Sequence, residues 1–331
     1  MDDRGRPSVS LRGPRATVLR VLVPLKVGMA GGGSDLPAYY VSATGRCVNF
    51  AVALRLTLTC DSRTAGRLRF LVPPRTPIEY AQRVAQRSGL LSRCGITVHV
   101  PVVPGSGLGC SSALSVALAL ARRSLDDECP DAGAVAEEAW QIEQTVGSVG
   151  KQDHYASAFG GANSLEFTDK GVRVRRLNLP FRVRETLDQC FVLARARGRR
   201  DCEILGRQAR NCESDSLVRH AIDQRVALVP AFEAALARGD LRQLSDLMRL
   251  DWLLKQNMDK GMYASDVTEL FDAGVRAGAL AGRLLGAGGS GFLLFVAEPE
   301  RRRSVIEQLA RISCDVRPVR LEWERPALVE M

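Results

Sequence analysis

One glycine-rich segment, PGSGLGCSSALS at residues 104–115, constrains this chain more than any other. It follows an apolar stretch predicted to be a strand (96–103) and leads into an Ala- and Leu-rich stretch predicted to be a helix. Gly105, Gly107 and Gly109 lack a Cβ, so the main chain there can approach a ligand closely. The unpaired N–H groups that open the helix then attract a negative charge. The segment predicts a phosphate-binding loop.

Two familiar nucleotide-binding loops do not fit this segment. A dinucleotide-binding Gly-x-Gly-x-x-Gly turn that starts at Gly105 would need glycine where the chain has Cys110. A P-loop needs Gly-Lys followed by Ser or Thr, and Gly150-Lys151 is followed by Gln152. A tight turn from strand to helix that binds nothing is the remaining alternative.

Three further segments, distant in sequence, carry related features. Residues 24–35 (PLKVGMAGGGSD) form an apolar strand with Lys26 that ends in three glycines and an acid. Residues 284–296 (LLGAGGSGFLLFV) place glycines before an apolar strand, and residues 143–161 (EQTVGSVGKQDHYASAFGG) supply carboxylates and a cation. Several such loops in one chain indicate one shared site rather than separate turns.

Together these segments resemble the GHMP kinase superfamily, which is named for galactokinase and for homoserine, mevalonate and phosphomevalonate kinases. Its three motifs occur in order between Leu22 and Val296. Within the superfamily, the phrases AGGGSD, GSGLGCSSAL, GKQDHYASAFGG and LLGAGGSGF resemble those of the bacterial D-glycero-D-manno-heptose 7-phosphate kinases. Galactokinases usually carry a Gly-Glu-His-Thr-Asp type phrase where this chain has GGSD at residues 32–35.

The resemblance implies an α+β fold with two lobes. The N-terminal lobe (16–181) would be similar to domain 2 of ribosomal protein S5, and the C-terminal lobe (182–331) would be ferredoxin-like, after a loose tail at 1–15. The residue patterns themselves predict alternating strands and helices, then a mainly helical region. Predicted strands are 18–27, 46–60, 68–72, 96–103, 162–167, 190–194, 291–297 and 314–320. Predicted helices are 78–88, 111–125, 203–238, 240–256, 264–277 and 299–310.

The chemistry implied by the resemblance is phosphoryl transfer, which depends on positioning and on charge stabilisation. Asp153 corresponds to the catalytic aspartate that accepts the proton of the attacking hydroxyl, although a solvated loop aspartate is the alternative. Lys26 would lower the pKa of that hydroxyl and pair with Asp153. The chain has only five lysines, and both Lys26 and Lys151 fall inside motifs, which indicates a need for compact ammonium groups.

ATP and Mg²⁺ are the cofactors that the resemblance implies. The residues expected to bind the nucleotide are Pro104, Gly105, Ser106, Gly107, Leu108, Gly109, Cys110, Ser111 and Ser112. Mg²⁺ binds few protein oxygens besides phosphate and water. The resemblance assigns it to Ser111 and Glu143, with Ser112 as the alternative to Ser111. Both serines could instead simply cap the helix, and Glu143 could merely border the loop.

The expected substrate-binding residues lie in three segments: Gly32, Gly33, Ser34 and Asp35; Lys151; and Gly288 and Gly289. Asp35 resembles the aspartate that binds sugar hydroxyls, but it could instead cap a short helix at 36–40. Lys151 could point to solvent, and Asn49 could face the site or end a buried turn. The arginine-rich segment 195–200 could clamp a phosphate or form a solvated surface.

Composition limits the partners and the compartment. The chain has 331 residues, 46% of them hydrophobic, and a formal charge of +9, but the arginines are spread throughout and aromatic residues make up only 5%. We therefore expect anionic small molecules rather than nucleic acid as ligands. Nine cysteines without metal-ligand spacing, and no predicted membrane segment, indicate a cytoplasmic protein. Whether it is a monomer or a homodimer is left open by the sequence.

These patterns favour an ATP-dependent kinase that phosphorylates the anomeric hydroxyl of a heptose 7-phosphate. One alternative is a kinase of the same fold for an unphosphorylated sugar such as fucose or galactose. Another is a regulator of this fold that binds ATP and sugar without turnover, although the presence of Asp153 and Lys26 argues against it.

Overall fold

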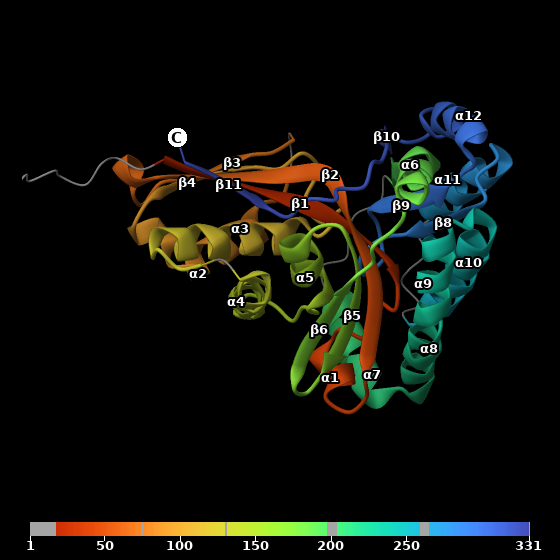
Figure 1. Ribbon diagram of the computed structural model, residues 1–331, viewed down its shortest axis with the longest axis horizontal. Coiled ribbons are helices and arrows are strands. Elements are labelled where there is room, and N and C mark those ends of the chain that lie inside the picture. The colour runs from red at the N-terminus through yellow and green to blue at the C-terminus, as the bar shows by residue number, and fades with distance from the viewer. Residues whose placement is uncertain (1–17, 74–75, 130, 197–203, 259–264, 331) are drawn as a thin grey trace, which may run out of the picture.

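A computed structural model of the protein describes residues 18–73, 76–129, 131–196, 204–258 and 265–330. In this part of the chain, the strands form one seven-stranded and one four-stranded sheet, each with its own helices (Figure 1). The first sheet has the order β11-β1-β2-β4-β3, with β5 and β6 attached through β2, and the second has the order β10-β7-β9-β8. The expected α+β fold with two lobes is confirmed.

The first lobe runs through β1 (Val18–Ala30), α1 (Pro37–Tyr40), β2 (Gly45–Asp61), β3 (Leu68–Leu71), α2 (Glu79–Arg87), β4 (Gly95–His99), α3 (Cys110–Leu125), α4 (Ala132–Gln144), α5 (Gln152–Phe159), β5 (Ala162–Thr168) and β6 (Gly171–Arg176). The chain continues through α6 (Phe181–Cys190), β7 (Phe191–Arg195), α7 (Ile204–Ser214), α8 (Ser216–Ala227), α9 (Val229–Arg238), α10 (Leu241–Gln256), α11 (Ser265–Arg276), β8 (Ala281–Leu284), β9 (Phe292–Val296), α12 (Pro299–Leu309), β10 (Val316–Pro318) and β11 (Ala327–Glu330).

Helices α2 to α5 lie along one face of the seven-stranded sheet (Figure 1). α3 is buried from Ala113 to Ala121, and its alanines allow it to pack closely on β1 and β2. The pairing of β1 with β2 shifts register between Pro24 and Leu25 and again between Gly28 and Ala30. Such irregularities bend a strand. They flank Lys26 and thus place the bend at the predicted catalytic lysine.

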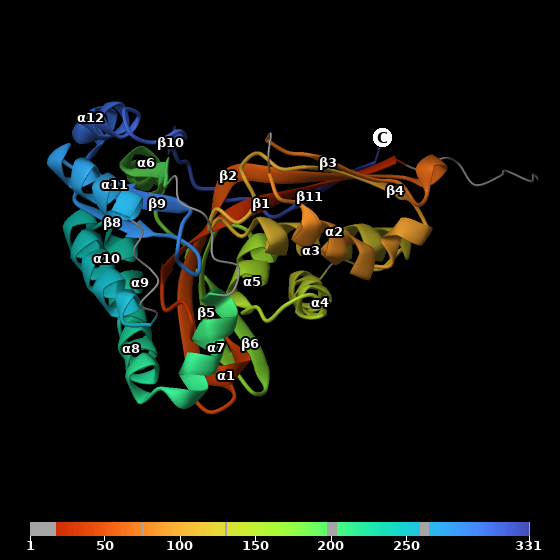
Figure 2. The same cartoon turned by 180° about the vertical axis from the view of Figure 1, so that it is seen from behind.

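Of the three hydrophobic clusters among the described residues, the largest spans both lobes. A single cluster of buried side chains includes Phe50 on β2 together with Phe191 on β7, whose ring centroids lie 6.3 Å apart. Helices α7 and α8 also pack against α1, where the Tyr39 hydroxyl donates a hydrogen bond to Asp223 at 2.6 Å (Figure 2). The lobes are therefore packed against each other and not merely linked.

Several predicted boundaries were wrong for identifiable reasons. β4 ends at His99 and not at Val103, because Pro101 and Pro104 lack the N–H groups that a strand pairs through. The predicted helix 203–238 is three helices, since Asp215 caps α8 and Pro230 opens α9.

The chain also does not divide cleanly at residue 181. Residues 327–330, assigned to the C-terminal lobe, form β11 and pair with β1 of the N-terminal lobe. No helix in the described ranges is long and apolar enough to cross a membrane. The predicted tail at 1–15 lies outside the described residues.

Candidate active site

The predicted phosphate loop connects β4 to α3. Gly105, Gly107 and Gly109 all have positive φ angles (84°, 87° and 71°), the left-handed conformation that glycine adopts most readily. Gly109 occupies the N-cap position of α3, where no side chain caps the helix. A helix start without a side-chain cap can bind an anion through its first N–H groups.

The third glycine segment supports this loop from behind. The Phe292 N–H donates to the Ser106 carbonyl at 2.9 Å. A Cβ at Gly107 would lie 2.8 Å from the carbonyl carbon of Leu285, and one at Gly286 would lie 2.7 Å from the Cα of Gly107. These contacts come from Gly286 and Phe292, whereas the predicted ligand-binding residues Gly288 and Gly289 are buried in the turn between them. Ligand contact by those two glycines stays a prediction.

Lys26 and Asp153 form an ion pair beside the end of the phosphate loop. Lys26 Nζ lies 2.5 Å from Asp153 Oδ1, and the Lys26 N–H donates to the Leu108 carbonyl at 3.0 Å. A Cβ at Gly109 would lie 3.1 Å from Lys26 Cε and 3.5 Å from Asp153 Oδ2. The Lys26 side chain is 4% exposed and that of Asp153 is 29% exposed. The carboxylate can therefore meet a ligand while the ammonium holds it from within.

Asp35 joins the first glycine loop to the start of α5. Its carboxylate accepts hydrogen bonds from Gly33 N–H at 3.0 Å, Gln152 N–H at 3.1 Å and the Gln152 side chain at 2.9 Å. Asp35 does not cap α1, whose N-cap is Leu36. Burial, and then the negative charge of Asp153, raise the pKa of Asp35 despite these N–H donors. Two carboxylates and one lysine thus meet at this site.

The other residues of the first glycine loop differ in where they face. Gly32 borders Gln152, whose side-chain nitrogen would lie 3.4 Å from a Cβ at that position. The hydroxyl of Ser34 is buried and donates to the Gly31 and Arg46 carbonyls at 2.7 and 3.1 Å. Ser34 therefore closes the loop onto β2, and its hydroxyl is already committed to the protein.

Glu143, near the end of α4, places its carboxylate beside the start of α3, where the predicted metal site would be. Its carboxylate accepts hydrogen bonds from Ser112 at 3.1 Å and Tyr80 at 3.2 Å, and it lies 2.8 Å from His154 Nε2. Burial alone would raise the pKa of Glu143, but hydrogen bonds from His154, Ser111 and Ser112 lower it overall. The structure thus brings together an ionised carboxylate and both candidate serines.

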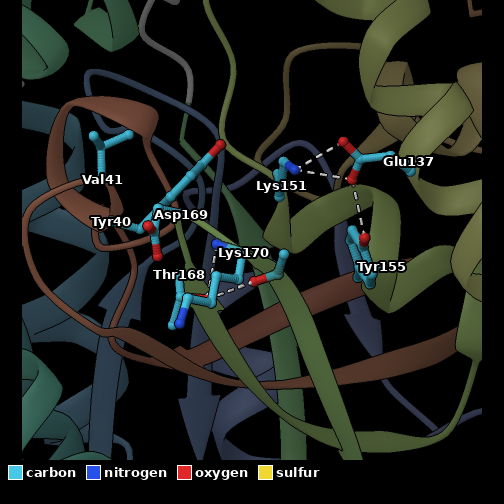
Figure 3. A pocket seen from close by; sticks show the side chains of 9 residues that line it. Tyr40, Val41, Glu137, Lys151, Tyr155, Thr168, Asp169 and Lys170 are labelled. Carbon is cyan, nitrogen blue, oxygen red and sulfur yellow. Dashed lines mark hydrogen bonds and ion pairs between the residues drawn. The ribbon is translucent and has the colours of Figure 1, made fainter.

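Lys151 lies to one side of this group. Its ammonium pairs with Glu137 at 2.8 Å and lies 4.2 Å from the ring centroid of Trp140. Figure 3 shows Lys151 and Tyr155 converging on Glu137, where they line a pocket of about 590 Å³ with Tyr40 and the turn 168–171. Neither Asp153 nor the phosphate loop lines this pocket. Substrate contact by Lys151 stays a prediction, with its charge already paired inside the protein.

Two residues of the site were missed in the sequence although they flank Asp153. Gln152 connects Asp35 to α5, and His154 contacts Glu143. The sequence GKQDH at residues 150–154 was the signal from which both residues could have been found. Asn49, left open in the sequence, is buried opposite Gly28 on β1, and its side-chain amide has no hydrogen-bond partner among the described residues.

The arginine-rich segment 195–200 is only partly described. Arg195 ends β7, where its backbone N–H donates to the Ser313 hydroxyl at 3.1 Å. Arg197, Arg199 and Arg200 lie outside the described residues. The proposed phosphate clamp at this segment therefore stays a prediction.

Comparison with known proteins supports the same interpretation. Family models described as "GHMP kinases N terminal domain" and "GHMP kinases C terminal" match residues 75–161 and 232–314. D-glycero-alpha-D-manno-heptose 7-phosphate kinase of Campylobacter jejuni is 27% identical over 319 residues, which is 88% of this chain and 93% of that protein. The bifunctional fucokinase/GDP-fucose pyrophosphorylase of Arabidopsis thaliana is 23% identical over 89% of this chain but only 31% of its own length.

A solved structure shows the same fold. The crystal structure of a D-glycero-D-manno-heptose 1-phosphate kinase from Bacteroides thetaiotaomicron has a TM-score of 0.74 at 23% identity, covering 95% of this chain and 99% of the other. The first family model contains the phosphate loop, Glu143 and Asp153, and the second contains the third glycine segment. The chain therefore belongs to the GHMP kinase superfamily of ATP-dependent small-molecule kinases.

Proposed function

We propose that this protein is a sugar 1-kinase that transfers the γ-phosphoryl group of Mg-ATP to the anomeric hydroxyl of a heptose 7-phosphate. The products would be the heptose 1,7-bisphosphate and ADP. The observation that carries the proposal is the Lys26–Asp153 pair beside Gly109, because a carboxylate next to the phosphate loop could act as a base there. The relative from Campylobacter jejuni, named as a heptose 7-phosphate kinase, supports the choice of sugar.

In the proposed reaction, Asp153 accepts the proton of the anomeric hydroxyl as its oxygen attacks the γ-phosphorus. The bond between that phosphorus and the bridging oxygen of ADP breaks. Lys26 keeps the Asp153 carboxylate oriented through the 2.5 Å ion pair and lowers the pKa of the nearby hydroxyl by its charge. The N–H groups at the start of α3 and in the phosphate loop bind the phosphates.

The residues around Glu143 fit a magnesium ion. An ionised carboxylate and the hydroxyls of Ser111 and Ser112 are oxygen donors, the kind that Mg²⁺ prefers. In the described residues no three His, Cys, Asp or Glu side chains gather as a metal site, so most ligands would come from phosphate and water. Bound there, Mg²⁺ would neutralise charge on the β- and γ-phosphates.

Sugar hydroxyls would be bound by Asp35 and Gln152. Asp35 is buried next to Asp153, and the side chain of Gln152 lies between Gly28 and Gly32. A Cβ at Gly28 would lie 3.3 Å from Gln152 Oε1 and 3.8 Å from Lys26 Nζ. The glycines thus let the Gln152 side chain pack against the first glycine segment, close to Lys26.

The direct test uses the purified protein with Mg-ATP and a panel of heptose 7-phosphates, free hexoses and mevalonate. ADP release gives the rate, and phosphorus NMR identifies the product. A new anomeric phosphate on a heptose 7-phosphate alone is the expected result. Turnover of free sugars only would replace the heptose assignment with a kinase of unphosphorylated sugars, a candidate favoured by the match to fucokinase/GDP-fucose pyrophosphorylase. No turnover of any compound would contradict the proposal.

A further inference from the structure

Four charged side chains are buried together in the C-terminal half of the protein. Arg225 on α8, Asp251 and Lys255 on α10, and Arg283 on β8 are each at most 5% exposed. Asp251 pairs with Arg225 Nε at 2.8 Å and with Arg283 Nη1 at 2.7 Å. One carboxylate thus faces three basic side chains and pairs directly with two of them. We call these four residues the buried charge cluster.

Buried charges are costly unless they are paired, so an excess of basic over acidic groups needs an explanation. Several of the remaining donors of the cluster turn toward backbone carbonyl groups, while Arg283 Nε has no hydrogen-bond partner among the described residues. Arg225 donates to the Gly32 carbonyl and Arg283 to the Met29 carbonyl. Lys255 Nζ donates to the Leu284 carbonyl at 2.9 Å and the Gly286 carbonyl at 2.6 Å. The acceptors therefore belong to the first and third glycine segments of the active site.

The contacts of Lys255 extend to the phosphate loop through one further layer. The Gly286 backbone, which Lys255 holds, packs directly on Gly107, where an added Cβ would lie 2.7 Å from the Gly107 Cα. Arg225 likewise holds the backbone of the first glycine loop, on the sugar side of the site, through the Gly32 carbonyl. Its Nη2 would lie 3.6 Å from a Cβ at Gly32, beside the side chain of Gln152. The cluster thus contacts loops on both the nucleotide and the sugar side.

A carbonyl and the N–H of the next residue point in opposite directions along the same peptide. Cations that hold these carbonyl groups therefore fix the orientation of the peptides in both loops; the N–H that follows the Gly32 carbonyl, that of Gly33, donates to Asp35 at 3.0 Å. The same cations also add a positive field behind the loops, which an anionic ligand offsets and an empty site does not. Burial, and then the charges of Arg283 and Arg225, lower the pKa of Lys255 far below its usual range, as this unfavourable arrangement requires.

We propose that Lys255 and Arg225 are positioning residues, Lys255 for the nucleotide phosphates and Arg225 for the phosphate acceptor, and that Lys255 reduces the stability of the ligand-free protein. Lys255 acts through the Gly286 carbonyl on the phosphate loop, and Arg225 acts through the Gly32 carbonyl on the first glycine loop. A residue with a purely structural role would instead stabilise the protein whether or not a ligand is bound.

The first test replaces Lys255 with methionine, which keeps the apolar stem and removes the charge. Lys170→Met, at an exposed lysine in the β5–β6 turn, is the matched control. We expect Lys255→Met to unfold at the same or a higher temperature than the natural protein without ligand. We also expect it to bind a non-hydrolysable Mg-ATP analogue about tenfold more weakly by calorimetry, the effect of losing a charged hydrogen bond. The control should change neither value.

Either of two results with Lys255→Met would overturn the proposal. One is unchanged affinity for the nucleotide analogue. The other is weaker binding together with a clear loss of thermal stability, which is the signature of a structural residue. This arm needs no sugar, so it is independent of the proposed substrate.

The second test uses Arg225→Met and rests on the proposed function for its phosphate acceptor. We expect the KM for the acceptor to rise about tenfold, with the affinity for the nucleotide analogue within twofold of the natural protein. If Arg225→Met weakened nucleotide binding as much as Lys255→Met, the proposal that the two residues act on different ligands would be overturned. Failure of the natural protein to phosphorylate any acceptor would instead count against the proposed function alone.

Discussion

Asp153 is the residue on which the proposed chemistry depends most directly. Asp153→Asn keeps the size of the side chain but removes the base, so we expect kcat to fall about 10²-fold or more, while the affinity for Mg-ATP changes less than twofold. Asp169→Asn, at an exposed aspartate in the β5–β6 turn, is the matched control. Turnover and calorimetric binding are measured on both variants. Near-normal turnover by Asp153→Asn would remove this residue from the mechanism.

The surroundings of Glu143 lower its pKa, and we therefore predict how the stability of the protein changes with pH. Its pKa in the folded protein lies below the ordinary value of 4.5, so ionised Glu143 stabilises the fold. This contribution is complete above pH 4.5 and is lost as the pH falls through the lower, folded-state pKa. At neutral pH, we expect Glu143→Gln to lower the free energy of unfolding by about 1–3 kcal/mol.

Urea denaturation of the ligand-free protein between neutral and acidic pH tests this prediction. The difference between the natural protein and Glu143→Gln should shrink as the pH falls below 4.5. Glu269→Gln, at an exposed position on α11, should show a small and nearly constant difference. A Glu143→Gln difference that grows toward acidic pH would have the wrong sign for a lowered pKa.

Single residues could be predicted from the sequence where a motif fixes both their type and their neighbours. The Lys26–Asp153 contact was predicted because a strand lysine and a loop aspartate lay in two motifs expected to share a site. Lys151 shows where such reasoning stops. Its partner Glu137 lies one helix earlier, and nothing in the local phrase indicates that pairing. The buried charge cluster was likewise invisible, because its four residues come from three distant elements.

At the level of elements, the position of the phosphate loop depends on its close packing against the third glycine segment. Gly107 and Gly66 have similar φ angles, +87° and +81°, but a Cβ at Gly107 would lie 2.8 Å from Leu285 whereas Gly66 faces open space. Alanine should therefore cost about 1–2 kcal/mol of stability at either position through backbone strain. Only Gly107→Ala should also displace the loop, and we expect it to weaken Mg-ATP binding about tenfold or more.

Comparing these two variants separates the effect of backbone strain, which both share, from the effect of the close contact with Leu285, which only Gly107→Ala has. Urea denaturation measures the shared loss of stability, and calorimetry with the Mg-ATP analogue measures the loss specific to Gly107. If Gly66→Ala weakened nucleotide binding as much as Gly107→Ala, the packing of Gly286 on Gly107 would have no special role in the site.

The positions of helices and strands were predicted well where the hydrophobic pattern agreed with the flanking glycines, as for α3 and β9. They were missed where a tertiary contact defines the boundary. α5 begins at Gln152 because the Asp35 carboxylate, more than a hundred residues earlier, accepts its first N–H. Its sequence, rich in glycine just upstream, indicated only a loop. A side chain that caps a helix from another segment leaves no local pattern.

At the scale of the whole molecule, the path of the chain could not be predicted from local patterns. β11 crosses from the C-terminal half to pair with the edge of β1, and its four residues carry no signal for that partner. The shared core, with Phe50 of β2 against Phe191 of β7, similarly depends on how the two sheets meet. The first feature connects the lobes through backbone hydrogen bonds, and the second connects them through packing.

The shared core leads us to expect a single cooperative unfolding transition, although a chain of this length often unfolds in steps. Two single-tryptophan variants can report the unfolding of each lobe separately. One keeps only Trp140 on α4, and the other keeps only Trp252 on α10. Their fluorescence should change at the same urea concentration. Two distinct midpoints would mean that the lobes fold independently.

Removal of residues 326–331 tests the same coupling, because it deletes β11 and exposes the edge of β1. If the lobes unfold together, the midpoints reported by Trp140 and Trp252 should fall by the same amount, even though β11 pairs only with the N-terminal sheet. Mg-ATP should then raise both midpoints together, since a ligand that binds only the folded state stabilises the whole cooperative unit. A shift confined to Trp140 would show that the contact between Phe50 and Phe191 does not couple the two lobes energetically.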